Sequence, residues 1–210
     1  PLFLAPPVLL YTGRVGVVDV AGAGLGIWAV VLYTVRDRLP VARGLLAGAL
    51  LTATFLLRRY FLFFAVSFGV AALLANLLFQ RRQWRDFLAL FVSTAVTSLF
   101  FGQSFLVDQV LKMNYGDLYS AYDQGRWVDY MMVTRYFGLV LLAMALALGV
   151  WMLLRRREKR WVAVLALAQP LICFVLFTRV QSHGQQHLLI YLPAFALLLA
   201  AGLEALPHTK

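Results

Sequence analysis

The chain has 210 residues, of which 62% are hydrophobic and 13% charged, and its mean hydropathy is +0.81. In soluble domains about a quarter of all residues are charged. A water-soluble fold could therefore not bury the apolar surface of this chain. The net charge of +10 would suit a nucleic-acid partner, but the basic residues separate apolar runs instead of forming a stripe on one face. These features exclude a soluble domain, give no support to nucleic-acid binding and indicate a multi-pass membrane protein.

Charged and turn residues divide the chain into apolar segments of the length that crosses a bilayer, about 20 residues in a helix. The seven segments are 15–34, 42–57, 60–79, 87–103, 135–154, 161–178 and 188–206. We therefore expect an all-α transmembrane bundle of about seven spans, forming a single domain over residues 1–210. Because the chain starts at Pro1 and shows no signal-peptide pattern there, we also expect further sequence upstream.

The only long connection between these segments covers residues 103–134. Its first part, from Phe105 to Met113, mixes apolar and polar residues in the manner of a short helix lying at a membrane surface. Asn114 and Gly116 are residues that commonly end such a helix. We expect a short interfacial helix followed by a loop.

The orientation follows from the basic residues in the connections, because cytoplasmic loops carry an excess of Lys and Arg. One set of connections holds twelve of the nineteen basic residues and the opposite set holds seven. We expect the richer set to be cytoplasmic, in a multi-pass protein of the cytoplasmic (inner) membrane. The richer set comprises Arg36, Arg38, Arg43, Arg81, Arg82, Arg85, Arg155, Arg156, Arg157, Lys159, Arg160 and Lys210.

Chemically useful side chains gather on the expected outer, extracytoplasmic face. The wider outer set comprises Asp19, Asp117, Asp123, Arg126, Asp129, Arg135, Arg179, Gln181, His183, Gln186 and His187. Asp19 carries the most weight, because a carboxylate inside an apolar run costs about 2.5–3.5 kcal/mol at the centre of a membrane helix and less near its end. It is either a functional acid or an interfacial residue favoured by the positive end of its helix.

Three other outer features have both a functional and a plain interpretation. The stretch from Arg179 to His187 holds a cation, two histidines and three amides, which suits phosphate oxygens or simply a polar turn. The stretch from Tyr115 to Tyr130 mixes aromatic rings, carboxylates and amides, which suits a sugar or a solvated loop. Arg58 and Arg59 separate two spans and are expected to reach the headgroups as snorkelling residues more than to bind phosphate.

Metal ligation has little support in the sequence. The lone Cys173 lies in an apolar run and is read as a packing residue. His183 and His187 are four residues apart, but no carboxylate lies beside them in the sequence, so no metal ligand is assigned.

Three stretches, in chain order, resemble the GT-C class of integral-membrane glycosyltransferases, which includes protein O-mannosyltransferases and aminoarabinose transferases. Residues 11–33, with Arg14 and Asp19 entering a long apolar helix, resemble the second acidic motif of that class. Residues 44–60 resemble the small-residue helix ending in a basic pair, and residues 186–193 resemble the polar turn and Pro-containing helix near the end of the membrane region. The first acidic motif of the class has no counterpart before Asp19, so we expect it in sequence upstream.

The resemblance implies a hexosyl or pentosyl transferase of cell-envelope glycan biosynthesis. Its donor would be a polyprenyl-phosphate sugar, its acceptor a glycan, lipid or protein outside the cytoplasm, and a divalent metal, Mg or Mn, could assist it. Asp19 matches the second acidic position and is assigned as catalytic. Local chemistry adds substrate-binding candidates, which are Arg14, Asp117, Tyr119, Asp123, Arg126, Arg179, Gln181 and His187.

Two further classes of function remain open. A transporter or flippase of a lipid-linked sugar would also need many helices, but its charges commonly lie near the bilayer midplane. A non-catalytic assembly subunit would use the outer loop only to bind a partner. In this chain the charges avoid the centres of the apolar segments, which favours chemistry at the membrane surface.

Overall fold

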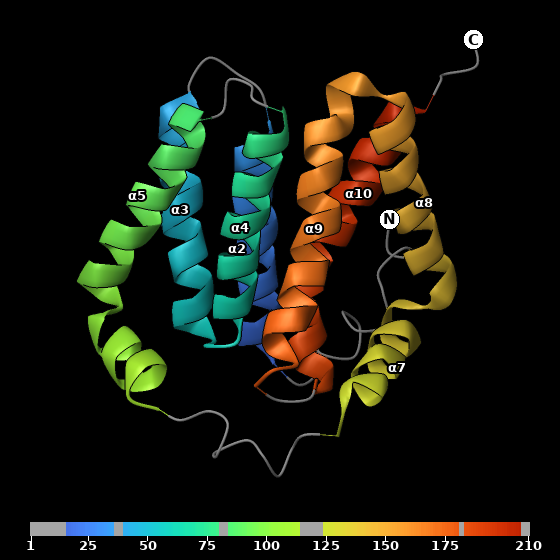
Figure 1. The fold of residues 1–210 in the computed structure, drawn as a ribbon. Helices are drawn as coiled ribbons and strands as arrows, with labels where there is room; N and C mark the ends of the chain where they lie inside the picture. The colour runs from blue at the N-terminus through green and yellow to red at the C-terminus, as the bar shows by residue number, and fades with distance from the viewer. Residues whose placement is uncertain (1–15, 36–39, 80–83, 114–123, 181–182, 207–210) are drawn as a thin grey trace.

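The computed structural model describes residues 16–35, 40–79, 84–113, 124–180 and 183–206, and over these ranges the chain is helical with no strand (Figure 1). The α-helices are α2 (Val17–Thr34), α3 (Pro40–Leu57), α4 (Phe61–Phe79), α5 (Trp84–Phe101), α7 (Arg126–Phe137), α8 (Leu139–Arg155), α9 (Arg160–Phe177) and α10 (Leu192–Ala205). Shorter helical turns are η2 (Phe105–Leu111), η4 (Arg157–Lys159) and η5 (Gln185–Tyr191). The all-α prediction is confirmed for these ranges, and a helix is present where the sequence predicted one after Phe105.

Five helices of the described chain are long and apolar enough to cross a membrane: α2, α4, α5, α9 with η4, and α10 with η5. The bent pair of α7 and α8 would make a sixth, and α3 is a shorter apolar helix over Val41–Leu57. Each expected segment is therefore helical, although not always as one helix, and five or six candidate spans are found where about seven were expected. Length and hydropathy make this a multi-pass integral membrane protein.

The expected span 135–154 does not run as one helix. α7 ends at Phe137, Gly138 adopts a φ of +79°, and α8 begins at Leu139. Because that backbone conformation is left-handed and open mainly to glycine, the chain turns there instead of continuing. The axes of α7 and α8 differ in direction by 92°. The first residues of the expected segment therefore belong to α7, which runs nearly perpendicular to α8.

The connections between the helices lie at two opposite ends of the bundle (Figure 1). At one end, hereafter the Asp19 end, lie the start of α2, the turn between α3 and α4, η2, α7 and η5. The opposite end carries the starts of α3, α5 and α9, with basic residues that include Arg43, Arg85 and Arg155 to Arg157. The structure thus groups the described connections into the same two sets as the sequence did, and the assignment of the Asp19 end to the outside stays a prediction.

Close packing between α3 and α5 depends on small residues. A Cβ atom at Gly44 would lie 2.5 Å from the carbonyl oxygen of Asp86, and one at Gly48 would lie 2.5 Å from that of Leu90. One turn further on, Thr52 hydrogen bonds to Thr97 across the same interface, at 2.7 Å. Membrane helices associate in this way because lipid gives no hydrophobic drive, so close backbone approach and interhelical hydrogen bonds stabilise the contact.

Inside the bundle, neutral polar side chains pair with one another. Asn76 of α4 donates to the Tyr33 hydroxyl of α2 at 3.2 Å and accepts from the Trp161 indole of α9 at 3.0 Å. Ser67 of α4 accepts from the Gln169 amide of α9 at 3.0 Å. These bonds join three helices in the buried interior without placing a charge there.

Candidate functional site

The carboxylate of Asp19 forms a buried polar cluster at its end of the bundle. The residue is only 4% exposed, and the hydroxyl of Tyr60 donates a hydrogen bond to its Oδ1 at 2.7 Å. Nε of Arg58 lies 2.9 Å from the same oxygen, and the Arg58 side chain is half exposed. We call Asp19, Arg58 and Tyr60 the Asp19 cluster.

Local structure explains how these three residues meet. Asp19 lies in the first turn of α2, where a negative side chain is favoured by the helix dipole, and its carboxylate packs against Gly16, the residue that caps the helix. Arg58 and Tyr60 lie in the tight turn between α3 and α4, and α2 packs against α3 along its length and against Phe61 at the start of α4. Burial and the hydrogen bond to Asp19 raise the pKa of the Tyr60 hydroxyl, so Tyr60 stays a donor over the ordinary pH range.

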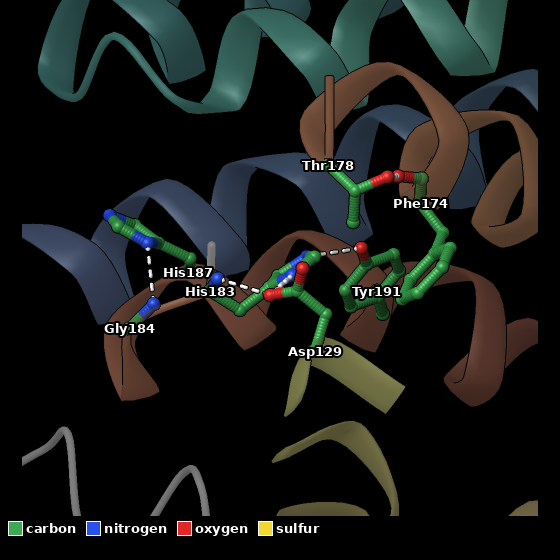
Figure 2. Close-up of polar contacts among 7 residues, drawn as sticks. All are labelled: Asp129, Phe174, Thr178, His183, Gly184, His187 and Tyr191. Carbon is green, nitrogen blue, oxygen red and sulfur yellow. Dashed lines mark hydrogen bonds and ion pairs between the residues drawn. The ribbon is translucent and has the colours of Figure 1, made fainter. Parts of the chain in front are cut away.

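A second buried cluster consists of Asp129, His183 and Tyr191 and is called the His183 cluster (Figure 2). Oδ1 of Asp129 accepts from the backbone N–H of His183 at 2.5 Å and lies 2.8 Å from its Nδ1. Nε2 of His183 lies 2.5 Å from the Tyr191 hydroxyl. The side chains of His183 and Asp129 are 0% and 2% exposed.

These contacts fix the roles of the groups in the His183 cluster. An ionised Asp129 can only accept, so Nδ1 of His183 donates to it, and Nε2 on the other side of the ring forms the hydrogen bond with the Tyr191 hydroxyl. The imidazole also stacks on Phe177, with ring centroids 4.4 Å apart. Because every polar atom of the ring has a partner and the ring is sealed from solvent, the cluster holds α7, the 183–184 turn and η5 together.

Aromatic contacts connect the two clusters through His187. The imidazole of His187 lies edge-on to Tyr60 at 4.8 Å between centroids and 5.0 Å from the ring of Phe177, which stacks on His183. Nδ1 of His187 accepts from the backbone N–H of Gly184 at 2.9 Å (Figure 2). A neutral His187 therefore carries its proton on Nε2, which lies 3.5 Å from the side-chain amide of Gln186.

The structure describes four of the nine residues predicted for the site. Asp19 and His187 come together through Tyr60. Arg126 and Arg179 are exposed at the same end of the bundle, on α7 and just after α9. The remaining candidates, Arg14, Asp117, Tyr119, Asp123 and Gln181, lie outside the described residues.

Sequence reasoning did not single out most members of the two clusters. Arg58 was expected to reach the headgroups more than to bind phosphate, and the structure pairs it with Asp19. Asp129 and His183 stood in the wider outer set but not among the assigned site residues, and Tyr191 was placed near the outer start of an apolar span. The available signal was that all of these residues fall in or beside connections of the same end.

Among the described residues, no group of three or more His, Cys, Asp or Glu side chains is placed to hold a metal ion. Asp19 has a cation and a hydroxyl as its neighbours, which are not metal ligands of the kind that Mg or Mn prefers. The described part of the site therefore does not fit a divalent cation.

Comparison of the chain with protein-family models, with curated proteins and with solved structures finds no match in any of the three. The class shown for this chain is accordingly a polytopic helical membrane protein, and the resemblance to GT-C glycosyltransferases belongs with the proposals.

Proposed function

We propose that the protein is a membrane glycosyltransferase, or the membrane portion of one, that transfers a sugar from a polyprenyl-phosphate donor to an acceptor hydroxyl outside the cytoplasm. The observation that carries the proposal is a carboxylate buried at one end of a membrane bundle and held beside a half-exposed arginine. A carboxylate taken out of water in this setting is costly, and such residues commonly have a function.

The reaction needs a base for the acceptor and positive charge for the leaving phosphate. Among the described residues, Tyr60 and Arg58 both contact Oδ1 of Asp19, while Oδ2 packs against Gly16. We assign the carboxylate of Asp19 to take the proton from the acceptor hydroxyl. The acceptor oxygen then bonds to the anomeric carbon while the bond from that carbon to the phosphate oxygen breaks. The polyprenyl phosphate leaves with the bonding electron pair, and the proton stays on Asp19.

Cationic and donor groups at this end suit the departing phosphate. The guanidinium of Arg58 is half exposed and keeps donors beyond the Nε that contacts Asp19. Arg179 is exposed, and His187 lies in η5 at the same end. Charge-assisted hydrogen bonds from such groups stabilise the negative charge that develops as the phosphate departs.

A second function, that of a non-catalytic assembly subunit, is favoured by one specific observation. Asp19 is nearly covered, and within the described ranges its contacts with Tyr60 and Arg58 come from side chains of this chain. A carboxylate in this arrangement could simply fasten α2 to the turn between α3 and α4. Transport is less well supported, because the interior polar side chains described above are neutral and pair with one another.

The test uses the full chain in lipid vesicles, with synthetic polyprenyl phosphates that carry either a hexose or a pentose. Transfer and donor hydrolysis are followed as release of the polyprenyl phosphate. Asp19→Asn keeps an acceptor for Tyr60 but cannot take a proton, so the rate is expected to fall by about 100-fold or more. Tyr60→Phe removes the supporting hydrogen bond and leaves the carboxylate, so its rate is expected to fall by about tenfold or less.

The rate is read together with the thermal midpoint of each variant. A folded Asp19→Asn protein that turns over as fast as the unchanged protein would contradict the catalytic assignment. A pair of variants with equal losses in thermal midpoint and normal donor turnover would instead support the fastening role.

A further inference from the structure

The helix α7 cannot be a membrane span by itself. It has 12 residues, about 18 Å of helix, whereas a span needs about 20 residues. It also carries two exposed arginines, Arg126 and Arg135. Because α8 is the apolar member of the pair and the bend between the two is 92°, α7 runs across the direction of the spans, as Figure 1 shows at the Asp19 end.

One face of α7 is fixed to the bundle. Asp129 belongs to the His183 cluster and is 2% exposed, and Phe137 lies edge-on to Phe195 of α10 at 4.9 Å between centroids. Tyr136 accepts a hydrogen bond from the side-chain amide of Gln185. This face therefore has partners from η5, α10 and the 183–184 turn.

The opposite face of α7 is apolar and exposed. Trp127 is 72% exposed, Tyr130 49% and Met131 50%, and their spacing of three and four residues puts them on one side of the helix. The rings of Trp127 and Tyr130 stack at 5.6 Å between centroids. Trp and Tyr concentrate at membrane surfaces, because an apolar ring with a polar edge suits the headgroup layer.

Charge and continuity identify what covers this face. The only acidic residue of α7, Asp129, is buried, so both of its exposed charges are the positive ones of Arg126 and Arg135, one on each flank of the apolar stripe. The apolar exposure continues into the first turn of α8, where Leu139 and Val140 are 68% and 74% exposed on a helix that enters the membrane. A surface with this composition matches anionic headgroups above lipid chains.

We propose that α7 is an interfacial helix whose Trp127, Tyr130 and Met131 face binds the surface of the lipid bilayer and prefers anionic lipid. The inference does not depend on glycosyl transfer, since it rests on the geometry of α7 alone. In this arrangement the His183 cluster fastens the inner face of α7 to the bundle while the outer face lies among the headgroups.

The test measures the depth of Trp127 with brominated lipids, which quench tryptophan fluorescence at short range. The full chain is placed in vesicles brominated either near the headgroup or near the chain ends, and the contribution of Trp127 is the difference between the protein and Trp127→Phe. Trp28 is the matched control, obtained from Trp28→Phe. It is 61% exposed on α2 and lies eleven residues, about 16 Å, from the start of that helix.

Bromines near the headgroup are expected to quench Trp127 about twofold more than bromines near the chain ends, and Trp28 should show the reverse order. At equal mole fraction, brominated anionic lipid should quench Trp127 about twofold more than brominated neutral lipid, and Arg126→Gln with Arg135→Gln should remove that difference.

Three results would overturn the proposal. Quenching of Trp127 by a water-soluble quencher but by neither lipid would place the face in water. Protection from all quenchers would mean that protein covers it, and quenching as deep as that of Trp28 would place α7 inside the bilayer.

Discussion

Removal of the Asp129 carboxylate is the perturbation whose cost the structure fixes best. Asp129→Ala leaves the backbone N–H and the Nδ1–H of His183 without their acceptor in a site where the two side chains are 2% and 0% exposed. Leaving a buried donor without its acceptor costs about 1–3 kcal/mol, and here two donors lose theirs. Hydrogen bonds inside membranes average about 0.6 kcal/mol, which places the expected cost near the lower end, at about 3 kcal/mol.

Asp129→Asn separates the charge from the hydrogen bonds. Both bonds end on Oδ1 of Asp129, and an asparagine oxygen could accept both of them. The expected cost is therefore about 1 kcal/mol, which is the difference between charged and neutral acceptors. Asp108→Asn is the matched control, because Asp108 also has a nitrogen partner, Lys112, but with side chains that are 55% and 68% exposed. It should leave the stability unchanged within error.

The assay is unfolding in mild detergent, followed by helical circular dichroism. For a chain of this size about 3 kcal/mol lowers the thermal midpoint by roughly 10 °C. The decrease in thermal midpoint should therefore be largest for Asp129→Ala, smaller for Asp129→Asn and absent for the Asp108→Asn control. If Asp129→Ala unfolded at the temperature of the control, the His183 cluster would not be fastening α7, and the reasoning from its geometry would be wrong.

Two further predictions concern packing and alkaline stability. Gly48→Ala should lower the thermal midpoint, because its Cβ would meet the Leu90 carbonyl oxygen at 2.5 Å. Gly69→Ala is the control and should leave the midpoint unchanged, because no atom lies within 4 Å of its Cβ. Equal effects of the two substitutions would contradict the close approach of α3 and α5. Burial raises the pKa of the Tyr60 hydroxyl in the folded protein above the value of about 10 in the unfolded chain. Above pH 10 the hydroxyl therefore loses its proton on unfolding. The contribution of Tyr60 to stability is complete below that pH and is lost as the pH rises further. Between pH 9 and 11.5 the unchanged protein should therefore lose more stability than Tyr60→Phe, and identical pH profiles in thermal unfolding would refute this.

The helices were largely predictable from the sequence, because runs of apolar residues long enough to cross a bilayer leave few other structures. The predicted segment 60–79 is α4 (Phe61–Phe79), and 15–34 contains α2 (Val17–Thr34). The error at 135–154 arose because hydropathy does not register the backbone of one residue. Gly138, with its φ of +79°, turns the chain inside an otherwise continuous apolar stretch.

The partners of the site residues could not be predicted in the same way. Asp19 was selected because a carboxylate in an apolar run is unusual, a property of one position. Its partner Tyr60 is 41 residues away, and His183 is 54 residues from Asp129. Which connection faces which depends on how the helices pack, and a single sequence of similar apolar helices carries little information about their neighbours.

The Asp19 cluster and the His183 cluster are connected by packed aromatic rings. The Asp19 cluster fastens α2 to the turn between α3 and α4, the His183 cluster fastens α7 to η5, and the rings of Tyr60, His187 and Phe177 lie in contact between them. Packed rings transmit displacement because interiors of this density deform little. A substitution that shifts residues 183–184 should therefore also shift His187 against Tyr60. The proposed depth of α7 among the headgroups and the position of the Asp19 carboxylate are then coupled.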